Sequence, residues 1–326
     1  MSHRLKTALV AAPFAFAVAA SQATPATAQA VQPASLTVED HQVRYRSAEI
    51  DGIEIAYREA GSSDRPTVLL LHGFPTSSHM FRNLIPELAE DYHVVAPDYP
   101  GFGASAAPPA EEFDYSFDTI AELVTGLIDE IGVDRYVVYL MDYGAPVGYR
   151  MFADDPERVA GFVIQNGNAY AEGLEKFWDP LRVYWGDPSE ENAAPLRAFL
   201  TLPGTIWQYT QGVQNLELIS PDAYWHAQYG LDRPGNQEIQ LELFYDYRTN
   251  LDLYPEWQAL FRNHQPPALL VWGQNDPIFP ASGAYPYRND LEDLEFHLLD
   301  TGHFALEDFG PFIAERMLAF LDRLEF

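Results

Sequence analysis

An acidic residue, Asp142, follows an apolar segment that has the pattern of a buried strand. Residues 136–141 are apolar or aromatic, and the small residues Gly144 and Ala145 come soon after the acid. Burying a carboxylate costs free energy, so such a residue usually has a function. A strand followed by a sharp turn and a helix is the geometry that presents a catalytic nucleophile. Because a carboxylate attacks carbon without further activation, Asp142 would form an alkyl ester with its substrate.

Two further polar residues follow predicted strands and complete a catalytic set. Asp276 comes after the apolar segment 268–272, and His303 comes after the segment 294–299. Either residue alone is also compatible with a structural role, Asp276 in a turn and His303 buried against backbone. The order nucleophile, acid, histidine favours a triad in which His303 activates water and Asp276 orients its imidazole.

The segment 72–75, His-Gly-Phe-Pro, leaves an apolar strand through a tight turn. Its position two strands before Asp142 favours a functional turn over an ordinary one. We expect the backbone N–H groups of Phe74 and Tyr143 to form an oxyanion hole, the second of them at a helix N-terminus.

The elements that must position these residues alternate between strand and helix patterns. A hairpin is expected from the alternating segments 41–50 and 53–58, which flank the turn residues 51–52. Helices are expected over 118–131, whose apolar residues have amphipathic spacing, and over 311–324. Short apolar runs predict buried parallel strands over 67–71, 93–96, 136–140 and 161–164, and the strand pattern returns at 268–272 and 294–299.

A different pattern interrupts this core between residues 170 and 262. Trp, Tyr, Pro and acidic residues are frequent there, with helical signals and no clear strand. We expect a helical lid over the carboxyl ends of the strands, inserted between two core segments, 31–169 and 263–326.

Residues 1–30 have the three parts of an export signal. Arg4 and Lys6 form a basic start, residues 8–20 are almost entirely apolar, and 28–30, Ala-Gln-Ala, is a small-x-small cleavage site. The apolar run is too short to cross a bilayer. We expect cleavage and a periplasmic or secreted protein; an Ala-rich disordered N-terminus is the alternative.

The composition excludes several kinds of partner. A formal net charge of −29 argues against nucleic acid and anionic membranes, and no later segment is apolar for long enough to span a membrane. The chain has no cysteine, so neither disulfides nor thiol chemistry are available. Neither zinc-ligand spacing nor a phosphate loop is present, so we expect no metal and no cofactor. A small, neutral, partly apolar substrate fits best.

The core motifs resemble those of the α/β-hydrolase superfamily, specifically its branch with aspartate nucleophiles, which holds epoxide hydrolases and haloalkane dehalogenases. The motifs are 72–75, 96–105, the turn at Asp142, 275–277 and 302–303. The resemblance covers residues 40 to 326 and implies an α/β-hydrolase fold, a mostly parallel eight-stranded sheet with helices on both faces and a helical lid. Leu140 departs from the pattern, because a small residue is usual at that position.

The resemblance also bears on the leaving group. Dehalogenases hold the departing halide with N–H donors, commonly a Trp after the nucleophile and, in one subgroup, an Asn after His-Gly. Tyr143 and Phe74 stand at these positions, and their side chains offer a hydroxyl and no donor, respectively. That subgroup also takes its triad acid from the strand after the nucleophile, where this chain has Gln-Asn-Gly at 165–167. Both departures favour epoxide opening.

Epoxide hydrolases donate a hydrogen bond to the opening ring from lid tyrosines. The segment 244–250, Phe-Tyr-Asp-Tyr-Arg-Thr-Asn, resembles the lid segment that carries one of them, which indicates Tyr247. Tyr184 is the candidate for the second, and Tyr209 is the fallback. We therefore predict an exported, cofactor-independent epoxide hydrolase that gives a vicinal diol. A haloalkane dehalogenase-like hydrolase with an atypical halide site and a non-catalytic binding protein on the same fold are the alternatives.

Overall fold

The computed structural model describes residues 42–324 and 326 of the chain. The export signal predicted over residues 1–30 lies outside these residues. Within the described part, no helix is both long enough and apolar enough to cross a membrane.

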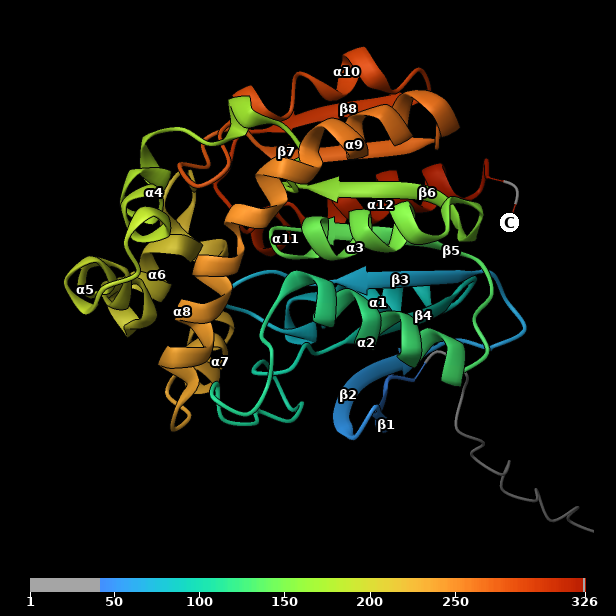
Figure 1. The fold of residues 1–326 in the computed structure, drawn as a ribbon. Coiled ribbons are helices and arrows are strands. Elements are labelled where there is room, and N and C mark those ends of the chain that lie inside the picture. Colours follow the sequence, from blue (N-terminus) through green and yellow to red (C-terminus); the bar gives the residue numbers. More distant parts are fainter. Residues whose placement is uncertain (1–41, 325) are drawn as a thin grey trace, which may run out of the picture. The chain divides into compact units, whose positions relative to one another are not determined.

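One sheet of eight strands forms the centre of the described chain (Figure 1). Its strands are β1 (Arg44–Ile50), β2 (Ile53–Ala60), β3 (Thr67–Leu71), β4 (His93–Pro97), β5 (Tyr136–Met141), β6 (Val159–Gln165), β7 (Ala268–Gly273) and β8 (Leu294–Leu299). They lie in the order β1-β2-β4-β3-β5-β6-β7-β8. Only β2 pairs antiparallel, with β1 and β4, while the neighbours from β4 to β8 run parallel. This confirms the mostly parallel sheet that the sequence predicted.

Helices cover both faces of the sheet (Figure 1). The core helices and helical turns are η1 (Ser78–Phe81), α1 (Leu84–Leu88), α2 (Phe117–Glu130), α3 (Gly144–Asp154), η2 (Pro156–Arg158), η7 (Ala281–Gly283), α10 (Tyr287–Asp290), α11 (Ala305–Asp308) and α12 (Gly310–Leu321). α2 and α3 pack against each other on one face, and α1 and α12 do so on the other.

Strand β3 illustrates why the core strands are apolar throughout. Leu69 and Leu71 point into the cluster of buried side chains that includes α2 and α3, while Val68 and Leu70 point into the cluster that includes α1 and α12. Successive side chains of a strand alternate between faces, so a strand covered on both faces needs a continuous apolar run.

The chain between β6 and β7 forms a helical cap, defined here as residues 171–264. Its elements are η3 (Ala171–Gly173), η4 (Lys176–Trp178), α4 (Asp179–Gly186), α5 (Glu190–Arg197), η5 (Ala198–Leu200), α6 (Leu202–Thr210), η6 (Leu216–Leu218), α7 (Pro221–Leu231), α8 (Asn236–Asp246) and α9 (Arg248–His264). The cap helices α4 to α8 lie beyond the carboxyl ends of the parallel strands (Figure 1). That edge of the sheet is where α/β folds place their ligands.

The last cap helix, α9, reaches from the cap back to the core. Phe261, near its C-terminal end, packs against Phe152 of α3 and Phe162 of β6, with ring centroids 6.3 and 6.0 Å apart. The lid boundary expected at residue 262 therefore falls inside one continuous helix.

Candidate active site

Asp142 lies in the sharp turn between β5 and α3. Its φ is 51°, in the left-handed region that side chains with a Cβ rarely adopt and that is often found at functional residues. A Cβ on Gly144 would lie 2.3 Å from the Leu71 carbonyl oxygen, so α3 can begin this close to β3 only with glycine there. The turn thus holds Asp142 at the sheet edge, under the cap.

Gly148 explains how the turn tolerates Leu140. A Cβ on Gly148 would lie 2.2 Å from the Leu140 Cδ2 atom, so the first turns of α3 leave space for that side chain. The departure from the family pattern at Leu140 is therefore accommodated by Gly148 of α3.

Two backbone amides converge on one oxygen of the Asp142 carboxylate. The N–H groups of Phe74 and Tyr143 both donate to Oδ1, each at 2.7 Å. This geometry brings together the three residues that we assigned to the nucleophile and the oxyanion hole. It fixes Oδ1 and leaves Oδ2 as the oxygen that faces the histidine.

His72 holds the turn that carries Phe74. Its Nε2 accepts a hydrogen bond from the Tyr99 N–H at 3.2 Å, so its Nδ1 carries the proton and donates to the Gly73 carbonyl oxygen at 2.9 Å. Burial lowers the pKa of His72, which keeps the ring neutral and able to accept. The ring also stacks on Tyr99, with centroids 4.0 Å apart.

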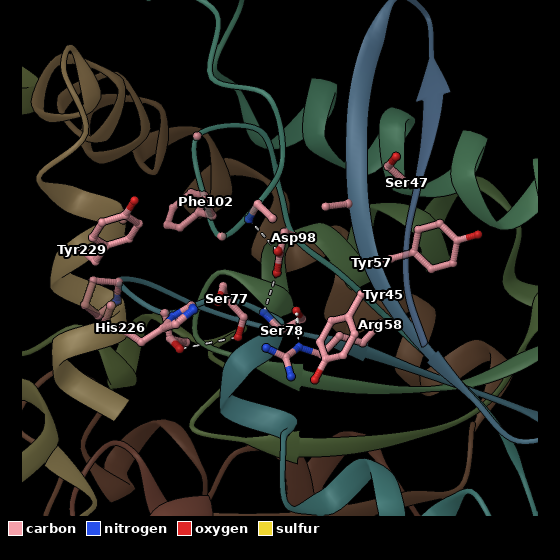
Figure 2. Close-up of a pocket in the computed structure, with 18 of the residues that line it drawn as sticks. Tyr45, Ser47, Tyr57, Arg58, Ser77, Ser78, Asp98, Phe102, His226 and Tyr229 are labelled. Atoms are coloured by element: carbon pink, nitrogen blue, oxygen red, sulfur yellow. Dashed lines mark hydrogen bonds between the residues drawn. The ribbon is translucent and has the colours of Figure 1, made fainter. Parts of the chain in front are cut away.

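Asp98 connects the next part of this turn to the loop after β4. Its Oδ1 accepts from the Ser78 N–H at 2.7 Å, and its Oδ2 accepts from the Ala104 N–H at 2.8 Å (Figure 2). Each hydrogen bond to a charged acceptor stabilises by about 1.5–3 kcal/mol, so one buried carboxylate fixes two loops.

His303 lies between the two predicted carboxylates. Its Nδ1 is 2.7 Å from Asp276 Oδ2, and its Nε2 is 3.5 Å from Asp142 Oδ2. Burial opposes a charge on the ring, but the carboxylates of Asp276 and Asp142 outweigh it and raise the pKa of His303 to about 10. The three side chains therefore meet at the sheet edge, in the arrangement that a water-activating triad requires.

Two polar residues at the end of β6 support the triad, and the sequence analysis did not assign them a role. The Asn166 amide donates to Asp276 Oδ2 at 2.8 Å, the same oxygen that His303 contacts. Gln165 donates to the His303 carbonyl oxygen at 3.1 Å. Their place at the carboxyl end of a strand next to β5 was the available signal.

A small cavity lies above Asp142 and is lined mainly by aromatic and aliphatic side chains. The lining residues are Phe74, Asp142, Tyr143, Phe177, Trp178, Leu181, Leu196, Phe199, Gln208, Phe244, Tyr247 and Ile278. The cavity has a volume of about 30 Å³, which is room for about two waters. Such a lining favours a small, uncharged, partly apolar molecule.

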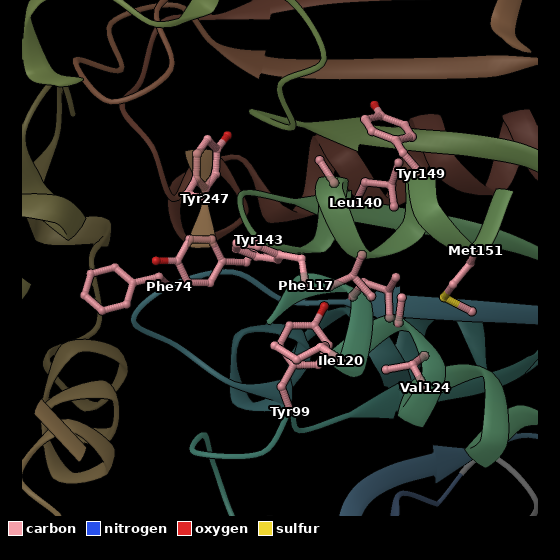
Figure 3. Close-up of a cluster of buried hydrophobic side chains, with 14 of the residues drawn as sticks. Phe74, Tyr99, Phe117, Ile120, Val124, Leu140, Tyr143, Tyr149, Met151 and Tyr247 are labelled. Atoms are coloured by element: carbon pink, nitrogen blue, oxygen red, sulfur yellow. The ribbon is translucent and has the colours of Figure 1, made fainter. Parts of the chain in front are cut away.

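Tyr247 lines this cavity, as the sequence analysis expected of a catalytic lid tyrosine. The Tyr247 hydroxyl lies 3.4 Å from the Tyr254 hydroxyl, and the Tyr254 hydroxyl accepts a hydrogen bond from the Asn168 amide at 3.0 Å. In Figure 3 the Tyr247 hydroxyl points away from the Phe74 ring. Burial, and then Tyr254 and Asp142, raise the pKa of Tyr247, so it stays protonated and able to donate.

Tyr143 contributes a second hydroxyl to the site, which we did not predict. This hydroxyl is buried and has no hydrogen-bond partner among the described residues. The ring lies 5.9 Å from that of Phe74, and in Figure 3 the hydroxyl points towards Phe74. Burial and the Asp142 carboxylate raise the pKa of Tyr143, so its proton is also retained. Buried hydroxyls are usually paired, so an unpaired one beside a nucleophile indicates a place for substrate.

The structure does not bring Tyr184, the candidate for the second lid acid, to the cavity above Asp142. Tyr184 does not line the cavity, and its ring packs against Tyr245 of α8, with centroids 5.9 Å apart. Leu181, one turn earlier on α4, occupies the lining instead. The fallback, Tyr209, does not line it either, because its ring stacks on Phe304 at 3.8 Å.

Among the described residues, no group of three or more His, Asp or Glu side chains is placed to hold a metal ion. The hydrogen bonds of the site pair Asp142 with two backbone amide donors and His303 with Asp276. The arrangement therefore has the parts for nucleophilic catalysis followed by hydrolysis.

The fold and this site define the class of the protein. Residues 66–309 match the family described as alpha/beta hydrolase fold, and the chain belongs to that family. Within it, the chain is an α/β-fold hydrolase that is related in sequence to proteins named haloalkane dehalogenases.

Individual relatives agree with this placement. An uncharacterized hydrolase of Saccharomyces cerevisiae is 45% identical over 273 residues, which cover 82% of this chain and 93% of the relative. A haloalkane dehalogenase of Mycolicibacterium paratuberculosis is 25% identical, covering 83% of this chain and 89% of the relative. The solved structure of the epoxide hydrolase CorEH has the same fold, with a TM-score of 0.71 and 21% identity over 86% of this chain and 99% of that one.

Proposed function

We propose that the protein is an epoxide hydrolase that forms an alkyl ester on Asp142. The observation that carries this proposal is the orientation of one carboxylate. Its Oδ1 is held by the Phe74 and Tyr143 amides, and its Oδ2 faces His303 Nε2. One oxygen is thus prepared to become the carbonyl oxygen of an ester, and the other is free to attack.

The reaction proceeds in two steps. Asp142 Oδ2 forms a bond to an epoxide carbon while the ring C–O bond breaks, and the ring oxygen takes a proton from a tyrosine hydroxyl. Water then gives a proton to His303 and attacks Asp142 Cγ, so that negative charge develops on Oδ1 between the two amides. The Cγ–Oδ2 bond breaks, and Oδ2 leaves in the diol and takes a proton from His303. The water oxygen remains in Asp142, and the second water proton passes to the tyrosinate, which restores the tyrosine and the Asp142 carboxylate.

The hydroxyls of Tyr247 and Tyr143 are the proposed donors to the ring oxygen. Because the Asn168 amide donates to Tyr254, the Tyr254 hydrogen is free to bond Tyr247, which leaves the Tyr247 hydrogen for the substrate. Tyr143 needs no rearrangement, since its hydroxyl has no competing partner among the described residues. Tyr143 takes the place of the second acid that we had sought in the cap.

Dehalogenation is the second candidate, because a related sequence is named a haloalkane dehalogenase. The cavity lining offers few hydrogen-bond donors for a departing halide. Its indole belongs to Trp178, whose N–H already donates to the Ile278 carbonyl oxygen at 2.8 Å. A halide would have to rely on hydroxyl donors, whereas an alkoxide gains a proton from them.

A substrate panel distinguishes the two reactions. We expect diol formation from small aryl and alkyl epoxides and no halide release from short haloalkanes. Tyr247→Phe and Tyr143→Phe should each lower kcat/KM for epoxides by about 100-fold, because each removes a donor to the ring oxygen. Halide release at a higher kcat/KM than diol formation would replace this proposal with the dehalogenase.

A further inference from the structure

The catalytic cavity is narrow in this structure, so space must open before a substituted epoxide can reach Asp142. Asp142 is only 5% exposed, and the space above it holds about two waters. An epoxide with a phenyl or alkyl substituent is larger than this space. Entry therefore requires a side chain or a loop to move.

A much larger cavity lies beside the catalytic one. It has a volume of about 520 Å³ and lies between the β1–β2 hairpin, the loops after β3 and β4, and α7 of the cap. Figure 2 shows Tyr45 and Arg58 on one side of it and Tyr229 on the other. Tyr45 is 74% exposed and Tyr229 is 78% exposed, the highest values among the large hydrophobic side chains of the described surface. Exposed aromatic side chains around a hollow indicate a place where partly apolar molecules bind or pass.

A thin aromatic partition separates the two cavities. Phe102 lines the larger cavity, Tyr143 lines the catalytic one, and their ring centroids are 6.4 Å apart at an angle of 90°. The neighbouring wall is equally thin, because Phe74 lines the catalytic cavity while Pro75 and Thr76, the next residues, line the larger one.

The loop that carries Phe102 is held by hydrogen bonds on both sides of that residue. Asp98 holds the end of the loop through the Ala104 N–H. Phe102 itself stands between Gly101 and Gly103, with φ of 84° and 49°, and its N–H donates to the Tyr99 carbonyl oxygen at 2.9 Å. A gate on this fixed backbone opens by rotation of the Phe102 side chain.

We propose that the larger cavity is the entrance to the active site and that Phe102 is its gate. The proposal rests on Asp142 being the nucleophile for epoxides. The same passage serves the second half of the reaction, because the hydroxyl groups of Thr76 and Ser77 in its wall suit incoming water and the departing diol. Phe102 then controls which epoxides reach Asp142 by the bulk of their substituents.

The absence of cysteine from the chain allows a direct blocking test. Ala104 is exposed and lines the larger cavity, whereas Val183 of α4 is 56% exposed and does not line it. Each would be replaced by cysteine and labelled with the same bulky aromatic maleimide. We expect the label at Ala104→Cys to lower kcat/KM for styrene oxide by about tenfold or more, and the label at Val183→Cys to leave it unchanged.

A second variant tests the gate itself. Phe102→Ala should raise the ratio of kcat/KM for styrene oxide to that for propylene oxide, while Phe102→Leu should change it less; thermal unfolding verifies that both variants are folded. Full activity of the labelled Ala104→Cys protein together with an unchanged ratio in Phe102→Ala overturns the proposed route. Failure of the unlabelled Ala104→Cys and wild-type proteins to hydrolyse any epoxide would instead reject the proposed function.

Discussion

In the proposed mechanism, the charge of His303 depends on whether Asp142 is a free carboxylate or an ester. Asp276 and Asp142 both raise its pKa, which is about 10 in the free protein, so the ring is protonated when substrate arrives. Alkylation removes the negative charge of Asp142 and therefore one of the two causes of that high pKa. In the proposed mechanism, His303 therefore becomes a base only after the ester has formed, when a base is needed.

This reasoning predicts different pH dependences for the two steps. The rate of ester hydrolysis should rise with pH and level off well below pH 10, because the pKa of His303 falls in the ester. The rate of ester formation should change little over the same range, since it needs no deprotonated histidine. Rapid-quench single turnovers measure both rates; a hydrolysis rate that keeps rising up to pH 10 would show that alkylation leaves the pKa of His303 unaltered.

Asn166 is predicted to be a positioning residue for this base. Asn166→Ala removes the donor to Asp276 Oδ2, so Asp276 holds the imidazole less firmly. Ester hydrolysis should slow by about tenfold, the equivalent of one hydrogen bond to a charged group, while ester formation is nearly unchanged. Asn192→Ala, at an exposed amide of the cap, is the matched control. Equal slowing of both steps would indicate a general structural role instead.

At the scale of elements, the nucleophile turn depends on glycines that make room for neighbours. Gly144 allows α3 to start against β3, and Gly148 makes room for Leu140 of β5. The sequence predicted the turn correctly because its apolar strand, acid and small residues are contiguous. It indicated one proposed donor, Tyr247, but placed the second at Tyr184, because the face that a cap tyrosine presents depends on helix packing: Leu181 lines the cavity and Tyr184, one turn later, does not.

The contact between Gly148 and Leu140 predicts a measurable coupling. Gly148→Ala should destabilise the protein by about 1–3 kcal/mol through overpacking, and Leu140→Ala by about 2–5 kcal/mol through the cavity that it leaves. The double variant should lose less than the sum, because the new methyl group occupies part of that cavity. Urea unfolding of the four proteins tests this; additive losses would mean that the two sites do not compete for space.

At the scale of the whole molecule, the sheet was the most predictable part and the cap the least. The inner parallel strands are mostly apolar runs covered on both faces, as β3 is, so their pattern is local; the edge strand β8, with Glu295 and His297, is only partly buried. The cap was predicted only as helical. The boundaries of its ten elements depend on turns and on packing between helices, which the sequence pattern does not reveal. The export signal over residues 1–30 stays a prediction.

The triad also links pH to the stability of the whole fold. The pKa of His303 is raised from 6.5 to about 10, so its ionic contacts stabilise the folded state fully below pH 6.5 and are lost as pH rises towards 10. The difference in unfolding free energy between wild type and His303→Gln should therefore shrink over this range. Chemical unfolding at a series of pH values measures it; a constant difference would contradict the raised pKa.

The central claim is that Asp142 is the residue that becomes alkylated. The most direct test is mass spectrometry of His303→Ala after incubation with an epoxide that the wild-type protein hydrolyses, because this variant should form the ester and fail to cleave it. We predict that the protein gains the mass of one epoxide, carried by the peptide that contains Asp142, and that His303→Ala combined with Asp142→Asn gains none. A protein that stays unmodified by every epoxide and alkyl halide, or an adduct on another residue, would contradict the account.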